Sequence, residues 1–312
     1  MVRKNKFQST IATGRFILPV VVIITIFIWL ISMGPWTESI TALIFAISGY
    51  LLIELNTAFS LIRIRTTIHV SLYWLMTSVC IFLHPLSRIV FIPLLFIVAM
   101  FYLFRSYESE KPSFNIFSSF FFLSIGSILF PSLIYFTPLI FISMISFRCM
   151  TVKSFCAGLT GILTPYWFLF AYSFLYDRMD IFYEPLIEMI KFSPSKFTTA
   201  PTNQLVSGCI ILALSVISTI DYLFSSYLDK TKIRMFFLFI IYIEIWNFII
   251  WFLQPQYIIG AIQIQIICYS LLTGHMFALT KNRFSSTFLV ITFVIITLLA
   301  IYNIWTQFFS FF

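Results

Sequence analysis

Residues 235–253 read MFFLFIIYIEIWNFIIWFL, an apolar run with one charged residue, Glu244, preceded by Arg234 and followed by Gln254 and Pro255. About 20 apolar residues in a helix cross the roughly 30 Å hydrocarbon core of a bilayer. A helix pairs its backbone polar groups within the segment, whereas an isolated strand in hydrocarbon leaves them unpaired. The run therefore predicts a transmembrane helix, and similar runs recur along the chain.

The composition extends this prediction to the whole chain. Of 312 residues, 61% are hydrophobic and 10% are charged, and the mean hydropathy is +1.02. Soluble domains carry about 25% charged residues, so this chain has too few to cover a water-facing surface. We expect an all-α, polytopic transmembrane helix bundle, a single transmembrane domain over residues 1–312, without a separate soluble catalytic domain.

The charge and the cysteines exclude further classes of protein. The net charge of +8 does not indicate nucleic acid, because Lys and Arg stand in twos and threes between apolar runs and not in a stripe with spaced aromatics. The five cysteines form no C-x-x-C pair and lie scattered through apolar segments, which predicts no disulfide framework. We expect no metal and no cofactor.

Eleven apolar runs have the length of membrane spans. They cover residues 16–33, 40–62, 68–83, 89–104, 114–130, 133–147, 155–175, 205–225, 235–253, 258–279 and 287–304. With the N-terminus inside, the loops between them divide Lys and Arg unevenly, as bacterial inner-membrane proteins do. The cytoplasmic residues are Arg3, Lys4, Lys6, Arg15, Arg63, Arg65, Arg105, Lys111, Arg148, Lys153, Lys230, Lys232, Arg234, Lys281 and Arg283, and the external ones are Arg88, Arg178, Lys191 and Lys196. We therefore predict a cytoplasmic N-terminus and an external C-terminus.

Parts of this topology have alternatives. The basic N-terminus and the run 16–33 also fit a cleaved signal sequence, although the run is long for one and Pro35 would follow the cut. The short runs 114–130 and 133–147 meet at Pro131 and would alternatively form a shallow re-entrant hairpin. Prolines within spans are expected to bend their helices, namely Pro19, Pro93, Pro138 and Pro165. Gly158 and Gly161, near Pro165, predict either close helix packing or a break.

Polar residues within the spans are the candidate site residues, because a charge in hydrocarbon costs about 2.5 to 3.5 kcal/mol on insertion scales. Glu244 is expected near the midplane, and Asn247 and Gln254 share its helix face by 3-4-3 spacing through Trp251. We call the predicted intramembrane set the polar seam, consisting of Glu54, Glu244, Asn247, Gln254, Gln263 and Gln265. It is interpreted either as a polar path or head-group slot, or as interhelical hydrogen bonding that includes a neutral Glu244.

Residues 176–204 form the longest predicted external segment. The sequence IFYEPLIEMIKF places Glu184, Glu188 and Lys191 on one side of a helix, which predicts a short helix on the membrane surface. Asp177 and Asp180 are the paired carboxylates outside the spans. They are interpreted either as catalytic residues, acting as a general acid and base or binding a diphosphate through a metal ion, or as a solvated pair neutralised by Arg178. The three histidines, His69, His84 and His275, are expected at the membrane interfaces.

The first 180 residues resemble a family of uncharacterised multispanning inner-membrane proteins of Bacteroidota. The resemblance rests on the basic N-terminus, Pro35-Trp36-Thr37-Glu38, the helix ending Glu54-Leu55-Asn56, and His84-Pro85-Leu86-Ser87-Arg88 leading into residues 96–105. It implies an inner-membrane location and brings no enzymatic signature. A second, weaker likeness is to membrane glycosyltransferases that use polyprenyl-phosphate sugars, but their long first external loop is reduced here to residues 34–39, with Glu38 as its acid.

Three functions follow as hypotheses, and the first is preferred. The chain is a non-catalytic subunit of an envelope assembly or a carrier for a lipid-linked substrate. Alternatively, it is a glycosyltransferase-like enzyme that uses a lipid-linked sugar donor at the external face through Glu38, Asp177 or Asp180. The third hypothesis is an ion-coupled transporter that works through Glu54 and Glu244. The expected partners are membrane lipid and either a lipid-linked glycan or other membrane subunits, with no nucleic acid.

Overall fold

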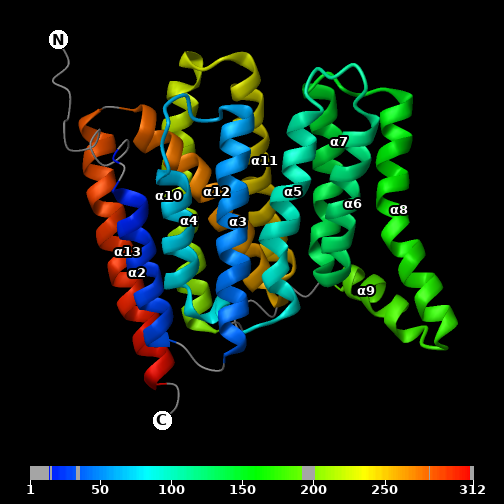
Figure 1. Ribbon diagram of the computed structural model, residues 1–312, viewed down its shortest axis with the longest axis horizontal. Helices are drawn as coiled ribbons and strands as arrows, with labels where there is room; N and C mark the ends of the chain where they lie inside the picture. Colours follow the sequence, from blue (N-terminus) through cyan, green and yellow to red (C-terminus); the bar gives the residue numbers. More distant parts are fainter. Residues whose placement is uncertain (1–13, 15, 33–35, 192–200, 281, 310–312) are drawn as a thin grey trace. The chain divides into compact units, whose positions relative to one another are not determined.

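The computed structural model describes residues 14, 16–32, 36–191, 201–280 and 282–309 (Figure 1). Within these residues the secondary structure is entirely helical, which confirms the predicted fold class. Several residues used in the predictions lie outside the described ones, namely Arg3, Lys4, Lys6, Arg15, Met33, Gly34, Pro35, Phe192, Lys196 and Lys281.

Seven helical segments among the described residues are long and apolar enough to cross a membrane. They are Thr37–Phe59, Arg88–Arg105, Val152–Leu175, Thr202–Leu228, Thr231–Leu253, Pro255–Leu279 and Arg283–Gln307. Four shorter apolar helical segments occur at Ile17–Ser32, Ile68–Val79, Ser113–Leu129 and Pro131–Ser146. The chain is therefore a polytopic helical membrane protein. The count of eleven spans and the orientation of the termini remain predictions.

The chain divides into two compact units, and unit 1 comprises residues 1–90, 201–233 and 265–312. Its helices are α2 (Ile17–Ser32), α3 (Thr37–Phe59), α4 (Ile68–Val79), α10 (Thr202–Ser225), α13 (Arg283–Phe309) and the part of α12 (Ile258–Leu279) that begins at Gln265. Helix α4 packs against α2, α3 and α13, and α10 packs against α13. Figure 1 shows these helices running alongside one another.

Unit 2 comprises residues 91–200 and 234–264. It contains α5 (Ile92–Arg105), α6 (Ser113–Leu129), the 3-10 helix η3 (Pro131–Phe136), α7 (Thr137–Ser146), α8 (Val152–Leu175), α9 (Asp180–Ile190), α11 (Thr231–Leu253) from Arg234 onward and the start of α12. Helix α6 packs along both α5 and α8. A Cβ atom on Gly161 would lie 2.6 Å from the carbonyl oxygen of Phe117. Gly161 therefore permits the close packing that was one of its two predicted roles.

The four prolines expected to bend their helices stand at different helix positions. Pro19 is the third residue of α2, and Pro93 and Pro138 stand in the first turns of α5 and α7. Helices α5 and α7 each continue a preceding 3-10 helix, at Arg88–Phe91 and Pro131–Phe136, so Pro93 and Pro138 lie where one helix type changes to the other. Pro165 lies in the interior of α8, and the bends themselves stay predictions.

The segment 114–147 forms two helical arms joined at η3. By helical rise, the 17 residues of α6 extend about 26 Å, and the six residues of η3 with the ten of α7 extend about 27 Å. Both lengths approach the roughly 30 Å thickness of the hydrocarbon core. These lengths favour two spans over a shallow hairpin.

Helix α12 is buried on all sides. Every residue from Gly260 to Ala278 is buried, including its glutamines, its hydroxyl residues and His275. Buried polar groups in folded proteins are generally hydrogen-bonded to protein or to water. Helix α12 is therefore where polar interactions inside the bundle are concentrated.

Candidate functional site

Four residues of the predicted polar seam are buried in unit 2. Glu244, Asn247, Gln254 and Gln263 have exposed fractions of 1 to 4%. The side-chain Nδ2 of Asn247 donates to the carbonyl oxygen of Ala261 at 2.9 Å, which joins α11 to the start of α12. The two helices are neighbours here, as their short connection predicted.

The other two seam residues lie in unit 1. Gln263 and Gln265 point to different sides of α12, because residues two apart on a helix are separated by about 200°. Gln265 Nε2 donates to Ser215 Oγ of α10 at 3.2 Å. Glu54 lies on an exposed face of α3 and accepts a hydrogen bond from Tyr50, one turn earlier. The structure therefore divides the predicted seam between the units.

Gln254 holds the end of α9 in place. Its Oε1 accepts a hydrogen bond from Ser132 Oγ at 2.7 Å, and its Nε2 donates to the carbonyl oxygens of Lys191 at 3.2 Å and Met189 at 3.3 Å. Tyr135 also donates to the Met189 carbonyl. The last carbonyls of a helix have no intrahelical donor, so these side chains satisfy groups that α9 leaves open.

Helix α9 is the predicted surface helix. Figure 1 shows it running across the ends of α6 and α8, and none of its side chains is buried. Glu184 is exposed as expected, but Glu188 accepts a hydrogen bond from Tyr257 at 2.9 Å and is only partly exposed. Ile187 and Ile190 are 53% and 76% exposed. Glu188 therefore departs from the expectation that it faces water, whereas the exposed Ile187 and Ile190 are available for contact with lipid, as a helix on a membrane surface requires.

The acidic candidates for catalysis do not form a buried cluster. Asp177 and Asp180 are exposed, and Asp180 lies 3.9 Å from Arg178 in an exposed ion pair. Asp177 has φ of 52° and ends α8, where the Arg178 N–H donates to the Ser173 carbonyl, a common way for a helix to terminate. Glu38 is buried in the first turn of α3 in unit 1. Among the described residues, no three His, Cys, Asp or Glu side chains are grouped to hold a metal ion.

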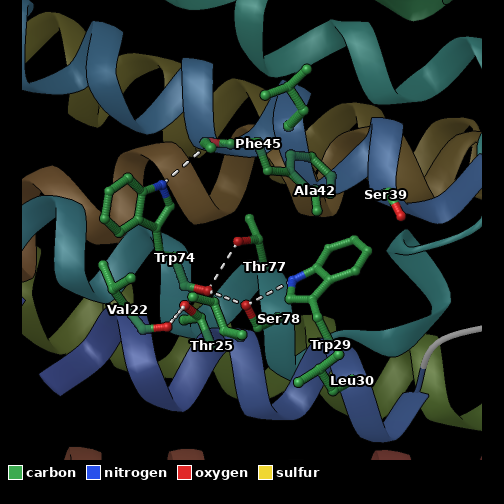
Figure 2. Close-up of a pocket in the computed structure, with 13 residues that line it drawn as sticks. Val22, Thr25, Trp29, Leu30, Ser39, Ala42, Phe45, Trp74, Thr77 and Ser78 are labelled. Atoms are coloured by element: carbon green, nitrogen blue, oxygen red, sulfur yellow. Dashed lines mark hydrogen bonds between the residues drawn. The ribbon is translucent and has the colours of Figure 1, made fainter. Parts of the chain in front are cut away.

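A groove that was not predicted lies between α2 and α3, with α4 closing its third side (Figure 2). Its volume is about 430 Å³. Exposed apolar side chains form its rim, with Ile26 and Leu30 on α2 and Leu43 on α3. The lining residues are Val22, Thr25, Ile26, Trp29, Leu30, Ser39, Ala42, Leu43, Phe45, Ala46, Trp74, Thr77 and Ser78. We call this cavity the α2–α3 groove.

Most polar atoms in the α2–α3 groove bond to the protein itself, as Figure 2 shows. Trp29 Nε1 donates to Ser78 Oγ at 3.1 Å, and Ser78 Oγ donates to the Trp74 carbonyl at 2.8 Å. Thr25 and Thr77 donate to carbonyls of their own helices. A polar ligand would have to compete with these bonds, whereas a hydrocarbon would not. The lining therefore suits an apolar occupant.

Neighbouring residues position two tryptophans in the wall of the groove. The Trp74 indole lies against Gly49, where a Cβ atom would come within 2.0 Å of Nε1, and it donates to the Phe45 carbonyl at 3.3 Å. Trp29 stacks on His84 with ring centroids 3.6 Å apart. His84 in turn contacts Ser32 Oγ at 2.9 Å. The groove is therefore a preformed cavity with rigid walls.

All three histidines are buried, and their predicted position near the membrane interfaces stays a prediction. Their exposed fractions are 1% for His69, 1% for His84 and 2% for His275. His84 supports Trp29, and His69 packs against Gly274. Helix periodicity alone did not reveal these contacts, because each partner belongs to another helix.

Neither a family model, nor a curated protein, nor a solved structure matches this chain. The resemblances of its first 180 residues to known families therefore stay predictions.

Proposed function

We propose that this chain is a carrier in the bacterial inner membrane that holds the hydrocarbon tail of a lipid-linked substrate in the α2–α3 groove. The observation that carries the proposal is the groove itself, about 430 Å³ in volume, apolar and bordered by exposed side chains. Ligand pockets typically measure about 300 to 1,000 Å³ and combine apolar walls with a few polar groups. Within a bilayer, the apolar molecules that reach such a rim are lipid chains.

The end of the groove next to Ser39 suits the polar part of the substrate. Ser39 and the buried Glu38 lie in the first turn of α3, and the adjacent Trp36 is 74% exposed. Tryptophan is enriched where hydrocarbon meets water in membrane proteins. The predicted orientation makes this the external end, so the head group would emerge at the outer surface.

The proposed topology has eleven spans, a cytoplasmic N-terminus and an external C-terminus. It is supported by the sum of seven long and four shorter apolar helical segments. The uneven distribution of Lys and Arg between alternate loops gives the orientation.

The glycosyltransferase alternative is less well supported by the geometry. Its candidate acids, Asp177 and Asp180, are exposed in unit 2, and Glu38 belongs to unit 1. An exposed ion pair such as that of Asp180 with Arg178 contributes little to positioning. The groove also favours a carrier over an assembly subunit, because packing against a protein partner does not require a preformed cavity.

Photocrosslinking in reconstituted membranes tests the proposal. The protein is reconstituted with a diazirine-bearing phospholipid, and separately with a diazirine-bearing polyprenyl phosphate. Crosslinked residues are then mapped by mass spectrometry. We expect the label to concentrate on α2–α3 groove residues, Ala42 and Trp74 among them, with at least one of the probes. Labelling spread evenly over the exposed faces of α2, α3 and α13 would contradict the proposal.

Two matched variants on α3 complete the test. Ala46 lines the groove, whereas Ala58 is exposed on the same helix outside it. Ala46→Phe places a ring in the cavity and should lower labelling of the groove by about tenfold, since it fills the space the chain would occupy. Ala58→Phe should leave it unchanged. Equal labelling of both variants would show that the groove is not the binding site.

A further inference from the structure

A buried ionic cluster lies in unit 1, apart from the α2–α3 groove. Asp229 Oδ1 lies 3.1 Å from Arg63 Nε in an ion pair, and Asp229 Oδ2 lies 2.9 Å from His275 Nε2. The side chains of Asp229 and His275 are only 1% and 2% exposed, whereas that of Arg63 is 42% exposed. Three segments distant in the sequence therefore meet at one buried carboxylate, and Arg63 is the one of the three side chains that is exposed.

The groups around His275 come from three helices. Tyr222 of α10 places its ring edge-on to the imidazole, with centroids 5.0 Å apart. Asp221, also on α10, accepts a hydrogen bond at 2.9 Å from Thr280, which follows the end of α12. From α4, His69 packs against Gly274, where a Cβ atom would lie 2.6 Å from the Cβ of His69. The cluster is therefore enclosed by polar and titratable side chains.

A column of paired polar side chains leads away from this cluster along α10. Ser218 Oγ and Thr273 Oγ1 are 2.8 Å apart, and Gln265 Nε2 donates to Ser215 Oγ at 3.2 Å. Ser207, Ser215, Ser218 and Tyr222 share one face of α10 with the buried Ile211, which lies between Ser207 and Ser215 over a rise of about 12 Å that water would have to bridge. The rise from Ser207 to Tyr222 is about 22 Å, most of the thickness of a hydrocarbon core.

The column ends at Asn303. Its Nδ2 donates to the Val79 carbonyl at 3.0 Å and to Ser207 Oγ at 3.2 Å. Asn303 also lines a cavity of about 750 Å³ at this end of unit 1. The other polar residues lining that cavity are Thr202, Asn203, Gln204, Thr306 and Gln307. We define the polar column as Ser207, Asn303, Ser215, Gln265, Ser218, Thr273, Tyr222, His275 and Asp229.

Further hydroxyl groups inside unit 1 indicate internal water. Thr41, Ser71, Tyr269 and Thr292 each bury a side-chain oxygen that has no hydrogen-bond partner among the described residues. Buried hydroxyls are nearly always satisfied, and water molecules supply the missing bonds where protein groups do not. Water molecules are therefore the expected hydrogen-bond partners of these four oxygens.

We propose that the polar column is a hydrated proton pathway that connects the cavity at Asn303 with the Asp229–His275 pair. Hydroxyl, amide and water groups relay a proton along it, and a ring nitrogen of His275 takes the proton up and releases it beside Arg63. Only N–H and O–H bonds form and break, so the transfer needs no oxidant or reductant. Buried ionisable residues that face the interior of a membrane protein commonly mark proton relays.

A metal cation fits this site less well than a proton. Metal sites in proteins usually need three or four ligands, and among the described residues no three His, Cys, Asp or Glu side chains are grouped to hold a metal ion. An imidazole, by contrast, can bind and pass on a proton through its two ring nitrogens. The proposal rests on residues outside the groove, so it stands or falls separately from the proposed function.

Proton flux into proteoliposomes is the direct test. Vesicles that contain the full chain and a trapped pH-sensitive dye receive a potassium diffusion potential, and acidification is followed. We expect a rate about tenfold above protein-free vesicles, as a relay across hydrocarbon would give. Asp229→Asn and His275→Gln should return the rate to the protein-free level. Asp180→Asn, an exposed aspartate in unit 2, is the matched control and should not change it.

A second variant covers the case in which the charge changes impair folding. Thr273→Val keeps the side-chain shape but removes the hydroxyl that pairs with Ser218. It should lower the flux about threefold or more by interrupting the relay. Wild-type flux equal to that of protein-free vesicles would overturn the proposal, as would unchanged flux in Thr273→Val.

Cysteine reactivity tests the water content of the column independently. In a cysteine-free background, Ser218→Cys should react with a small methanethiosulfonate reagent, because the reagent needs a thiolate in water. Val216→Cys on the exposed face of α10 should react about tenfold more slowly, since that face meets lipid and disfavours the thiolate. Equal, slow reaction at both positions would overturn the proposal of a hydrated column.

Discussion

Replacing Gln254 by leucine should release the C-terminal end of α9 from the rest of unit 2. Gln254 is 1% exposed and its side chain makes four hydrogen bonds, accepting from Ser132 and donating to the carbonyls of Met189 and Lys191 and, at 3.5 Å, to Tyr135 Oη. Leucine has a similar size but none of the polar atoms. The substitution therefore removes the hydrogen bonds while largely keeping the packing volume.

The expected loss follows from which partners remain satisfied. Without Gln254, the Met189 carbonyl still accepts from Tyr135 and the Lys191 carbonyl still accepts from Gln256. The Ser132 hydroxyl, by contrast, loses its acceptor. Leaving a buried polar group without a partner costs about 1 to 3 kcal/mol, and the loss of each of the other Gln254 hydrogen bonds costs somewhat less. The docking of α9 should weaken by about 2 to 3 kcal/mol, or about 30- to 150-fold in the opening equilibrium.

Hydrogen exchange of protein in lipid nanodiscs measures this opening. Amides of α9 should exchange faster by the stated factor in Gln254→Leu, while those of α6 and α8 should not change. Gln256→Leu is the matched control, because Gln256 is exposed, whereas Gln254 is buried, and both donate to the Lys191 carbonyl, Gln256 at 3.1 Å. Its effect should stay below about fivefold. If Gln254→Leu left the protection of α9 within threefold of wild type, the assignment of Gln254 as its tether would be refuted.

Three further predictions concern topology, the buried acid and helix packing. Alkaline phosphatase fused after Phe312 should be active and fused after Lys232 inactive, and the reverse at either site would defeat the eleven-span topology. Glu244→Gln should keep normal membrane abundance and Glu244→Leu should lower it, because a buried carboxyl near the midplane needs a polar partner; normal abundance of the leucine variant would disprove this. Gly161→Leu should destabilise the α6–α8 contact by about 1 to 3 kcal/mol through overpacking, measurable as a lower midpoint in thermal unfolding, and Leu163→Ala on the exposed face of α8 should not.

The helical elements were predictable because the bilayer sets their length and leaves few other options. The run at 235–253 lies within α11, and the prediction that α11 and α12 are neighbours is supported by the Asn247–Ala261 hydrogen bond. Helix ends were less predictable, because they depend on local caps. Helix α8 ends through the left-handed Asp177, whose side chain had been considered for catalysis. A residue predicted as a catalytic candidate can thus instead terminate a helix.

The sites were less predictable because they depend on pairs of distant residues. The periodicity of α11 placed Glu244, Asn247 and Gln254 on one face, but it did not indicate that Gln254 would meet the end of α9. Likewise, Gln265 was predicted to share the polar seam with Gln263, but it bonds to Ser215 of α10 and lies in the other unit. One helix gives the direction of a side chain, whereas its partner comes from the tertiary packing.

The burial of Asp229 could not be predicted from any single span. It stands between Leu228 and Lys230 in a short turn, where an acid beside several basic residues is expected to be solvated. The fold instead buries its carboxylate against His275, 46 residues away, and leaves Arg63 as the neighbour that reaches water. Removing two charged groups from water is costly, and the attraction between partners offsets that cost only when the geometry is close. The partners of this carboxylate come from distant segments, His275 from α12 and Arg63 from the turn between α3 and α4, so its burial depends on tertiary packing and not on the charges of its own loop.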